Sequence, residues 1–533
     1  MGEPLSRSRL PRFHEQRSPL MWRGGNARDS STSDEGSSSS HASPEAVAQR
    51  RWIARDHSAF ICALSNLSIQ YNFTAVTVAL ALMQHPELPP SSPQAAYPRS
   101  LAQESLLKSL VFAGAVVGQL LMGYAGDAIG RRRAMLLTNL LTVLGALGSA
   151  LLTWGEPAAV YAVLMACRCV LGVGVGGKYP LAATIRAEAC TDGEVSRHSA
   201  TEVAKGFFWQ TPGAMLPYVV GLLLVLYSPP GSSVAATAPD TALVSLQFRL
   251  VLGLGAVPAL LVMCLCYYQE ESASYVAARS HLEIAARSNA LESPNPVAVA
   301  LRHPEHWRRL AGTGLAWLLY DYVYYGTAFN QPHIIEQVFG HAGGHAGNPA
   351  ASLSLVANFW QNLVASAMGL PGVLLAIAML RPMGSKRLQG WGFVAIALAS
   401  MAFAVSLYVA VDKWTSFALT CLLVFAINWG VNVTSYVLPA EAFPSAVRSS
   451  FFGCSACLGK LGALLGTYTF GPIAAMGAHG IAWVFVVCAA VSLVGVGVTH
   501  GLVEPYGHGT LFGRRGKSAA MAVGSDVPLG ETT

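Results

Sequence analysis

The chain has 533 residues, of which 53% are hydrophobic and only 12% are charged, and its mean hydropathy is +0.44. About a quarter of the residues of a soluble domain are charged, so this chain has too few charges to cover a globular surface in water. The net charge of +6 follows from the one-sided placement of arginine and lysine described below, and it therefore does not indicate a nucleic-acid partner. The composition predicts a polytopic α-helical membrane protein.

The N-terminal residues 1–57 contain the stretch STSDEGSSSSHASPEA and lack the apolar run of a cleaved secretory signal. Such a composition cannot bury enough apolar surface to order itself, so residues 1–57 are expected to be a disordered tail. The first residues, MGEPLS, match the myristoylation pattern only weakly, because Pro4 lies within it. A second tail is expected over 504–533.

Between the tails lie twelve apolar segments of spanning length, since about 20 apolar residues suffice for a helix to cross the hydrocarbon core of a membrane. They predict an N-terminal six-helix bundle over 58–268, a cytoplasmic linker over 269–308 and a C-terminal six-helix bundle over 309–503. The segments are 58–83, 105–127, 134–154, 158–185, 204–228, 248–268, 309–330, 352–379, 389–411, 414–438, 450–475 and 480–503.

The fourth segment ends in GVGVGGKYPLAATIRAE, where Lys178 follows four closely spaced glycines. A bare lysine inside a membrane helix costs on the order of 3 kcal/mol, so it requires a partner or a function. The glycines do not indicate a dinucleotide-binding loop, because that loop follows a strand and opens a soluble helix. They predict close approach between helices instead.

Polar and charged residues recur in four other segments. In the seventh, Trp317, Asp321 and Tyr325 are spaced by four and therefore project from one helical face. A lone aromatic or asparagine is explained most simply by packing between helices, whereas an intramembrane charge must face an aqueous path or a counter-ion. The fifth, tenth and eleventh segments contribute Gln210, Asn428, Asn432, Tyr436 and Lys460.

The ten cysteines lie almost wholly within the predicted helices and show neither a disulfide framework nor the spacing of a metal site. No nucleophile–base pair stands out either. We therefore expect no cofactor, no metal and no enzymatic activity.

Arginine and lysine gather in the segments that lie on one side of the predicted spans, whereas the loops on the other side hold one arginine, Arg99. By the positive-inside rule both termini are cytoplasmic. We expect a multi-pass protein of the plasma membrane, with an organelle membrane as the alternative. The basic segments are 130–133, 269–308, 381–387 and the tail stretch GRRGK, and the opposite loops are 84–104, 229–247 and 331–351.

The two halves of the chain repeat each other. Gly384 lies 254 residues after Gly130, and Glu441 lies 253 residues after Glu188. Both pairs fall at the cytoplasmic end of the second or fourth span of their half. Matching offsets predict two halves of six spans each, which is typical of a carrier and is not required of a channel or a receptor.

Five stretches resemble a known family. GYAGDAIGRRR (123–133) is similar to the signature between the second and third spans of the major facilitator superfamily. RCVLGVGVGGKYPLAATIRAE (168–188) resembles the signature of its phosphate:proton symporters, and three later stretches resemble that family in the same order. The likeness extends from about residue 55 to about residue 507 and implies an all-α fold of 12 transmembrane helices in two six-helix bundles. The later stretches are WLLYDYVYYG (317–326), NWGVNVTSYVLPAEAFPSAVR (428–448) and GKLGA (459–463).

The resemblance implies a phosphate site, because the residue types that hold phosphate in the family are present here. A lysine supplies a positive charge, and the tyrosine, tryptophan and amide groups donate hydrogen bonds to a tetrahedral oxyanion. Asp321 can donate to an anion only when it is protonated, which makes it a candidate for proton coupling. The matching residues are Tyr179, Gln210, Trp317, Asp321, Tyr325, Asn432 and Lys460.

The chain departs from the family where the resemblance implies further carboxylates for proton movement. Lys178 stands at one of these positions and Ile69 at another, and Asn72 stands where a nearby acid is usual. Arg381 also replaces an aspartate that is expected between the eighth and ninth spans.

These departures change the charge of the central site. The family pattern gives −2 when one lysine faces three carboxylates, whereas Lys178 and Lys460 against Asp321 give +1. We therefore expect Lys178 and Asp321 to be charge-coupling residues, with Lys178 as a fixed charge offset by Asp321 or by the substrate. This hypothesis predicts transport that depends only weakly on protons. The alternative is a structural salt bridge between Lys178 and Asp321 in a scaffold that no longer transports phosphate.

Asp127, Arg131, Arg132 and Arg133 lie at the cytoplasmic ends of the second and third spans. Rocking of one bundle against the other would make and break their contacts, so we interpret them as gating residues. A simple signal for membrane topology is an equally good explanation of these charges.

The sequence thus predicts a secondary transporter of inorganic phosphate or a related anion, working by alternating access, with protons as a possible second partner and the lipid bilayer as its environment. The first alternative is a carrier of an organic phosphate or a polyol-type solute. The second is a nutrient sensor that binds the anion without moving it. A sensor usually carries a longer ordered cytoplasmic extension than residues 1–57 or 504–533 offer.

Overall fold

The computed structural model describes residues 44–83, 97–190, 197–227, 241–272, 275–277, 279–280, 296–302, 304–340, 354–477 and 479–503. Residues Met1–Ala48 form a unit of their own, of which only the start of helix α1 is described. All other described residues belong to the second unit, Gln49–Thr533. The predicted tail 504–533 lies outside the described residues, as does 1–43 of the first tail.

All the regular secondary structure in the described residues is helical. The helices are α1 (Pro44–Leu82), α2 (Leu101–Ile129), α3 (Arg131–Leu151), α4 (Pro157–Ala189), α5 (Arg197–Phe207), α6 (Gln210–Leu226), α7 (Thr241–Gly253), α8 (Ala256–Tyr268), α10 (Pro296–Ala300), α11 (Pro304–Phe329), α12 (Gln331–Gly340), α13 (Leu355–Ala367), α14 (Gly369–Met383), α15 (Ser385–Val409), α16 (Lys413–Asn428), α17 (Val431–Ala442), α18 (Arg448–Ala474) and α19 (Gly480–Leu502).

Ten helical stretches among the described residues are long and apolar enough to cross a membrane. The expectation of a multi-pass membrane protein is therefore confirmed. Three predicted boundaries shift: α1 begins at Pro44 rather than at residue 58, α11 begins at Pro304 inside the predicted linker, and the predicted loop 331–351 begins as helix α12.

Three predicted spans are each split into two helices, and a proline explains every break. Pro212, Pro258 and Pro371 are the third residues of α6, α8 and α14. Proline has no N–H group, so it cannot donate to the carbonyl four residues earlier, and the helix is interrupted at that point. Each pair of helices still forms one apolar stretch of spanning length, Ser199–Leu226, Ala242–Tyr268 and Leu355–Met383, so the spans predicted over 204–228, 248–268 and 352–379 are found with a break inside each.

A fourth break separates α16 from α17 and depends on glycine. Gly430 has a φ of 81°, which a residue with a side chain rarely adopts. A Cβ atom at this position would also lie 2.8 Å from the Leu388 carbonyl oxygen. The break places Asn428 at the end of α16 and Asn432 in the first turn of α17.

The glycines before Lys178 bring α4 into backbone contact with α2. A Cβ atom at Gly172 would lie 2.3 Å from the Val111 carbonyl oxygen, and one at Gly176 would lie 2.4 Å from that of Ala115. Distances this short leave no room for a side chain, so the close approach predicted from the glycines is confirmed.

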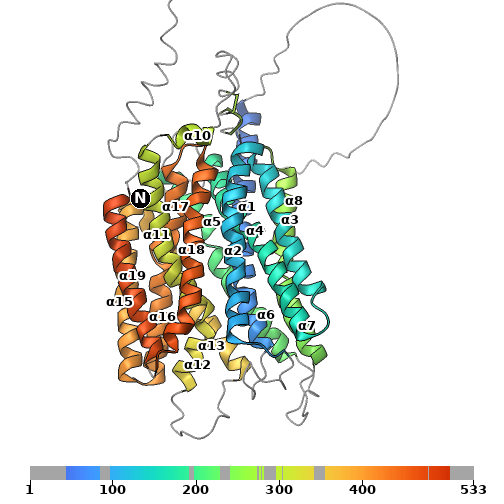
Figure 1. Ribbon diagram of the computed structural model, residues 1–533. Helices are drawn as coiled ribbons and strands as arrows, with labels where there is room; N and C mark the ends of the chain where they lie inside the picture. Colours follow the sequence, from blue (N-terminus) through green and yellow to red (C-terminus); the bar gives the residue numbers. More distant parts are fainter. Residues whose placement is uncertain are drawn as a thin grey trace, which may run out of the picture. The chain divides into compact units, whose positions relative to one another are not determined.

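Helices from the two halves of the chain lie on different sides of this unit. Figure 1 shows α2, α3, α4, α7 and α8 together on one side and α11, α15, α16, α18 and α19 on the other. The halves meet where α2 crosses α18, because a Cβ atom at Gly453 would lie 2.3 Å from the Gln119 carbonyl oxygen.

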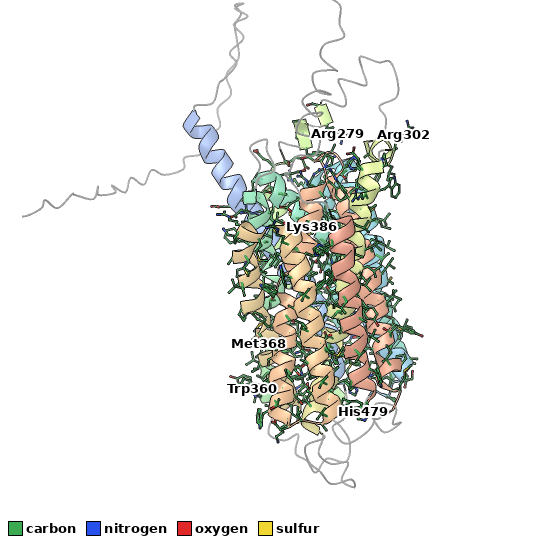
Figure 2. The ribbon with its side chains drawn as sticks, turned by 90° about the vertical axis from the view of Figure 1, so that its left-hand side faces the viewer. Arg279, Arg302, Trp360, Met368, Lys386 and His479 are labelled. Carbon is green, nitrogen blue, oxygen red and sulfur yellow. The ribbon has the colours of Figure 1, made fainter. Side chains whose placement is uncertain are left out.

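Basic residues mark one end of the unit. Figure 2 shows Arg279, Arg302 and Lys386 near this end, which we call the arginine-rich end, and Trp360 and His479 toward the opposite one. The separation agrees with the one-sided charge distribution of the sequence.

Candidate functional site

Lys460 of α18 lies at the centre of a buried cluster formed with α11. Its Nζ atom is 2.8 Å from the Asp321 carboxylate and donates to the Tyr325 hydroxyl at 3.0 Å. The three side chains are at most 3% exposed. The spacing of four residues brings Asp321 and Tyr325 to one face of α11, as the sequence predicts. The buried ammonium and carboxylate compensate each other's charge.

Aromatic rings from both halves cover the Lys460 ammonium. Its Nζ atom lies 4.2 Å from the ring centroid of Tyr325 and 4.7 Å from that of Tyr179 on α4. The two tyrosine hydroxyls are 3.2 Å apart. Trp317 of α11 lies edge-on to Tyr179, with ring centroids 6.1 Å apart. The electron-rich faces stabilise the cation, and the hydroxyls offer hydrogen bonds beside it.

The other two predicted ligands lie at helix breaks next to this cluster. Gln210 is the first residue of α6, and its buried Oε1 atom has no partner among the described residues. Asn432 donates to Asn428 at 2.9 Å across the break between α16 and α17. Five of the seven predicted residues therefore make one contact group, and two lie beside it.

Gln70 of α1 is a functional candidate that the sequence interpretation missed. Its Nε2 atom donates to the Tyr324 hydroxyl at 2.8 Å, and its Oε1 atom accepts from the Tyr325 hydroxyl at 3.4 Å. Both bonds join the two halves. An amide inside an apolar span is a signal in its own right, but the departures from the family pattern lie at the neighbouring positions Ile69 and Asn72.

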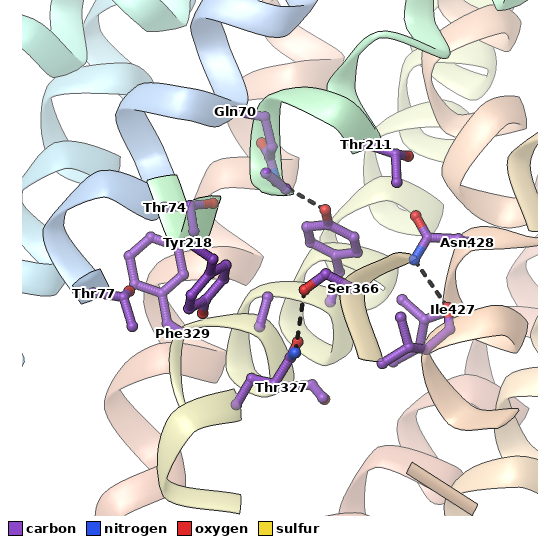
Figure 3. A pocket seen from close by; sticks show the side chains of 15 residues that line it. Gln70, Thr74, Thr77, Thr211, Tyr218, Thr327, Phe329, Ser366, Ile427 and Asn428 are labelled. Atoms are coloured by element: carbon purple, nitrogen blue, oxygen red, sulfur yellow. Dashed lines mark hydrogen bonds between the residues drawn. The ribbon is translucent and has the colours of Figure 1, made fainter. Parts of the chain in front are cut away.

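Gln70 and Tyr324 also line a cavity of about 50 Å³. Figure 3 shows its lining of hydroxyl, amide and apolar groups from both halves, with the Gln70–Tyr324 hydrogen bond at its edge. None of the lining residues is charged. The polar members are Gln70, Thr74, Thr77, Thr211, Tyr218, Tyr324, Thr327, Gln331, Ser366 and Asn428.

Lys178 does not join this cluster, which corrects the expected pairing with Asp321. It is 0% exposed, and its Nζ atom makes its one hydrogen bond within the described residues to Ser68 Oγ of α1, at 2.7 Å. Asp321 instead neutralises Lys460. Successive residues of an α-helix project about 100° apart, so Tyr179 faces the other half while Lys178 points into its own.

The gating candidates Asp127 and Arg131 do connect the two halves. Arg131 forms ion pairs with Asp127 at 3.1 Å and Glu188 at 3.0 Å, and its Nη2 atom donates to the Ser445 carbonyl at 2.7 Å. Asp127 accepts from the backbone N–H and the hydroxyl of Ser450, at 2.7 and 2.6 Å. These bonds tie α2 and α3 to α18 and the turn before it, near the arginine-rich end.

Arg132 and Arg133 have different surroundings. Arg132 donates to the carbonyls of Cys266 and Tyr267, which belong to α8 of the same half. Arg133 is exposed. The structure therefore brings one arginine of the run, Arg131, into contact with the other half.

The central cluster is closed on both sides. Toward the arginine-rich end, the contacts of Asp127 and Arg131 join the halves. On the other side Phe112 packs on Phe329 with ring centroids 5.1 Å apart, and Tyr218 lies 6.3 Å from Phe359. Each pair joins one half to the other, so the structure shows an occluded arrangement.

Comparison with known proteins identifies relatives over most of the chain. A family model described as sugar (and other) transporter matches residues 58–301 and 350–502. The inorganic phosphate transporter PT2 of Toxoplasma gondii is 36% identical over 443 residues, which cover 83% of this chain and 71% of that protein. A probable inorganic phosphate transporter 1-6 of Arabidopsis thaliana is 28% identical, with 79% and 85% covered.

Solved structures of the proton:xylose symporter XylE, a major facilitator superfamily protein, share the fold. The form bound to 6-bromo-6-deoxy-D-glucose gives a TM-score of 0.66 at 16% identity and covers 85% of this chain and 97% of that one. The partially occluded inward-open form from E. coli gives a TM-score of 0.64 at 16% identity, with 86% and 100% covered. The fold is that of the major facilitator superfamily, and the chain belongs to the sugar (and other) transporter family.

Proposed function

We propose that this protein is a secondary transporter that carries inorganic phosphate across a membrane by alternating access. The observation that carries the proposal is the buried Lys460, surrounded by hydroxyl groups and ring faces from both halves. A buried ammonium among hydrogen-bond donors suits a tetrahedral oxyanion. The relatives named as inorganic phosphate transporters support this choice of anion.

In this proposal Asp321 holds the place of the substrate in the empty carrier. Its carboxylate accepts a bond from Lys460 at 2.8 Å, as a phosphate oxygen would. When phosphate arrives, Lys460 and the hydroxyls of Tyr325 and Tyr179 turn to it, and the Asp321 carboxylate moves aside. Trp317, Gln210 and Asn432 supply further donors from both halves.

We further propose twelve spans in two bundles of six, at the boundaries predicted above apart from the shifted helix ends. Helices α1 and α11 supply the two spans beyond the ten apolar stretches, since both are long enough to cross. Their intramembrane polar residues, such as Gln70 and Asp321, lower their hydropathy. The arginine-rich end would be cytoplasmic, with both termini on that side, and the plasma membrane is the proposed location.

Alternating access would break the contacts of Asp127 and Arg131 with α18 and its preceding turn. Arg131 changes partners at low cost, because Asp127 and Glu188 move with it in the same half. Arg132 and Arg133 would then support topology rather than gating.

The cavity beside Gln70 favours a second candidate, a carrier of an organic phosphate. Uncharged hydroxyl and amide groups line it, and they suit the neutral, polyol-like part of such a substrate. The phosphate group would then lie at Lys460 and the remainder in the cavity.

Exchange of labelled phosphate across proteoliposomes tests the function and separates these candidates. We expect the purified protein to exchange inorganic phosphate, and Lys460→Met to abolish exchange. Competition by a sugar phosphate stronger than by phosphate itself would favour the organic substrate. Binding of labelled phosphate without exchange would indicate a sensor, and neither binding nor exchange would contradict the proposal.

A further inference from the structure

The surroundings of Lys178 fit a neutral amine. Its Nζ atom is fully buried and has a single neutral hydrogen-bond partner among the described residues, the Ser68 hydroxyl at 2.7 Å. An ammonium has three N–H donors, and burying it with unpaired donors and no counter-ion is strongly unfavourable. An amine carries no charge to compensate, so one hydroxyl partner suits it.

Carboxylates of the same half are bound elsewhere. Each one that forms an ion pair in the described part of this half pairs with a cation other than Lys178. The pairs are Glu104 with Arg99 and Lys108, Asp127 with Arg131, Glu188 with Arg131 and Arg448, and Glu202 with Arg186 and Lys205.

The groups that face Lys178 supply no negative charge either. Ser68 faces it from α1, and the titratable group of α8 that interacts with it is the Cys266 thiol, which is uncharged when protonated. Helix α4 has two other buried cations: Arg186 pairs with Glu202, whereas Arg168 donates to the Asn72 carbonyl of α1 at 2.7 Å and also lacks a carboxylate partner among the described residues. A charge on Lys178 would therefore add to that of Arg168 without a compensating carboxylate among the described residues.

We propose that Lys178 carries the proton that moves with phosphate, as an amine in the empty carrier and an ammonium in the loaded one. The inference rests on the proposed function. On one side the Nζ lone pair takes a proton from hydronium, so that an N–H bond forms, an O–H bond breaks and water is left. On the other side that N–H bond breaks and the proton passes to water. Ser68 serves both forms, since a hydroxyl can donate to the amine or accept from the ammonium.

Charge neutrality explains why this proton would be linked to phosphate. In the empty carrier Lys460 and Asp321 cancel and Lys178 is neutral. In the loaded carrier, dihydrogen phosphate brings one negative charge and the proton on Lys178 one positive charge. Lys460, Asp321, Lys178 and the bound phosphate then carry no net charge together in either state, which limits the cost of burying them in a low-dielectric medium. Lys178 is in this view a titrating group rather than the fixed charge expected from sequence.

The test uses proteoliposomes with two readouts. One is exchange of labelled phosphate at equal pH and equal phosphate concentration on both sides. Exchange requires only that the phosphate-bound carrier changes its orientation, because the empty carrier need not return. The other is net phosphate uptake driven by an inward proton gradient, with a pH-sensitive dye inside. The variants are Lys178→Met, Lys178→Arg and Lys178→His, and the control is Lys205→Met, an exposed lysine of the same half.

Lys178→Arg should keep measurable exchange but lose net uptake by about tenfold or more, because its empty form carries an uncompensated charge. In Lys178→Met the dye should record no phosphate-linked proton movement. Lys178→His should restore part of it at lower pH, because an imidazole binds a proton less tightly than an amine. Lys205→Met should match the wild type.

Proton-linked uptake at the wild-type rate in Lys178→Arg would overturn the inference, because a fixed charge would then suffice. Proton coupling that survives in Lys178→Met would overturn it in favour of Asp321. Wild-type exchange without any proton movement would refute the inference alone, whereas absence of exchange in the wild type would refute the proposed function itself.

Discussion

The two halves of the molecule each bury one lysine next to glycine, and they surround it differently. Lys460 has a carboxylate at 2.8 Å, a hydroxyl at 3.0 Å and ring faces around it. Lys178 has one hydroxyl. Two lysines that are equally buried thus differ in the protonation state that their surroundings favour. A counter-charge keeps the Lys460 ammonium charged, and without one the amine of Lys178 is the favoured form.

The halves also differ at the arginine-rich end. In the N-terminal half, Arg131 pairs with two carboxylates and donates to the Ser445 carbonyl of the other half. At the corresponding position of the C-terminal half, Ser385 donates to Glu441 at 2.9 Å. The offset repeat therefore preserves the position, with a serine hydroxyl in place of the Arg131 guanidinium, so the N-terminal corner should contribute more to closure.

Removing the charge of Lys460 should have the largest effect. Lys460→Met leaves the Asp321 carboxylate buried without a partner, which costs about 3–5 kcal/mol of stability, and transport should fall at least 100-fold, because the anion loses its counter-charge. Thermal unfolding in detergent and phosphate uptake measure the two effects. Adding Asp321→Asn should recover stability and not uptake. If uptake survives in Lys460→Met, the comparison between the two lysines fails.

Replacing the carboxylate of the same pair sharpens the comparison. Asp321→Asn keeps the shape of the side chain and leaves the Lys460 ammonium available to an anion. We expect labelled phosphate to bind at least as tightly as in the wild type, and net uptake to fall about tenfold, because the empty carrier then buries an unpaired cation. Equilibrium binding of labelled phosphate and net uptake measure these two outcomes. A loss of binding would show that Asp321 is a ligand of phosphate and does not merely occupy the place of phosphate in the empty carrier.

A smaller effect is expected at the N-terminal corner. Arg131→Ala removes the bond to the Ser445 carbonyl and takes the Arg131 counter-charge from Asp127 and Glu188, so the arginine-rich end should open more often. Uptake should fall several-fold, and labelling of the buried Cys62 thiol, followed by mass spectrometry, should increase. Arg133→Ala is the matched control, because Arg133 is exposed. Equal effects of the two variants would argue for a general topology signal.

The smallest effect is expected at the C-terminal corner. Ser385→Ala removes one hydrogen bond to Glu441, which is worth about 0.5–1.5 kcal/mol. Uptake should change less than threefold, as measured beside Arg131→Ala in the same vesicles. A loss as large as that of Arg131→Ala would show that the two corners share closure equally.

Much of the architecture could be predicted because apolar segments of spanning length have few alternatives in a membrane. The breaks were missed because apolar composition does not change where a helix is interrupted. Pro212, Pro258 and Pro371 signal three of them, whereas the break at Gly430 depends on contact with α15. Gln70 was missed because its importance arises from Tyr324, which is 254 residues away.

The sequence by itself determined the membrane class, the one-sided charge, the repeated halves and the residue types that suit an oxyanion. Only the tertiary structure decided which lysine Asp321 neutralises. Lys178 and Tyr179 are neighbours in the chain, but they project about 100° apart on the helix. The count of charges in the sequence assigned both lysines to one site. In the structure the angle between successive helical residues directs Tyr179 toward Lys460 and Lys178 toward Ser68.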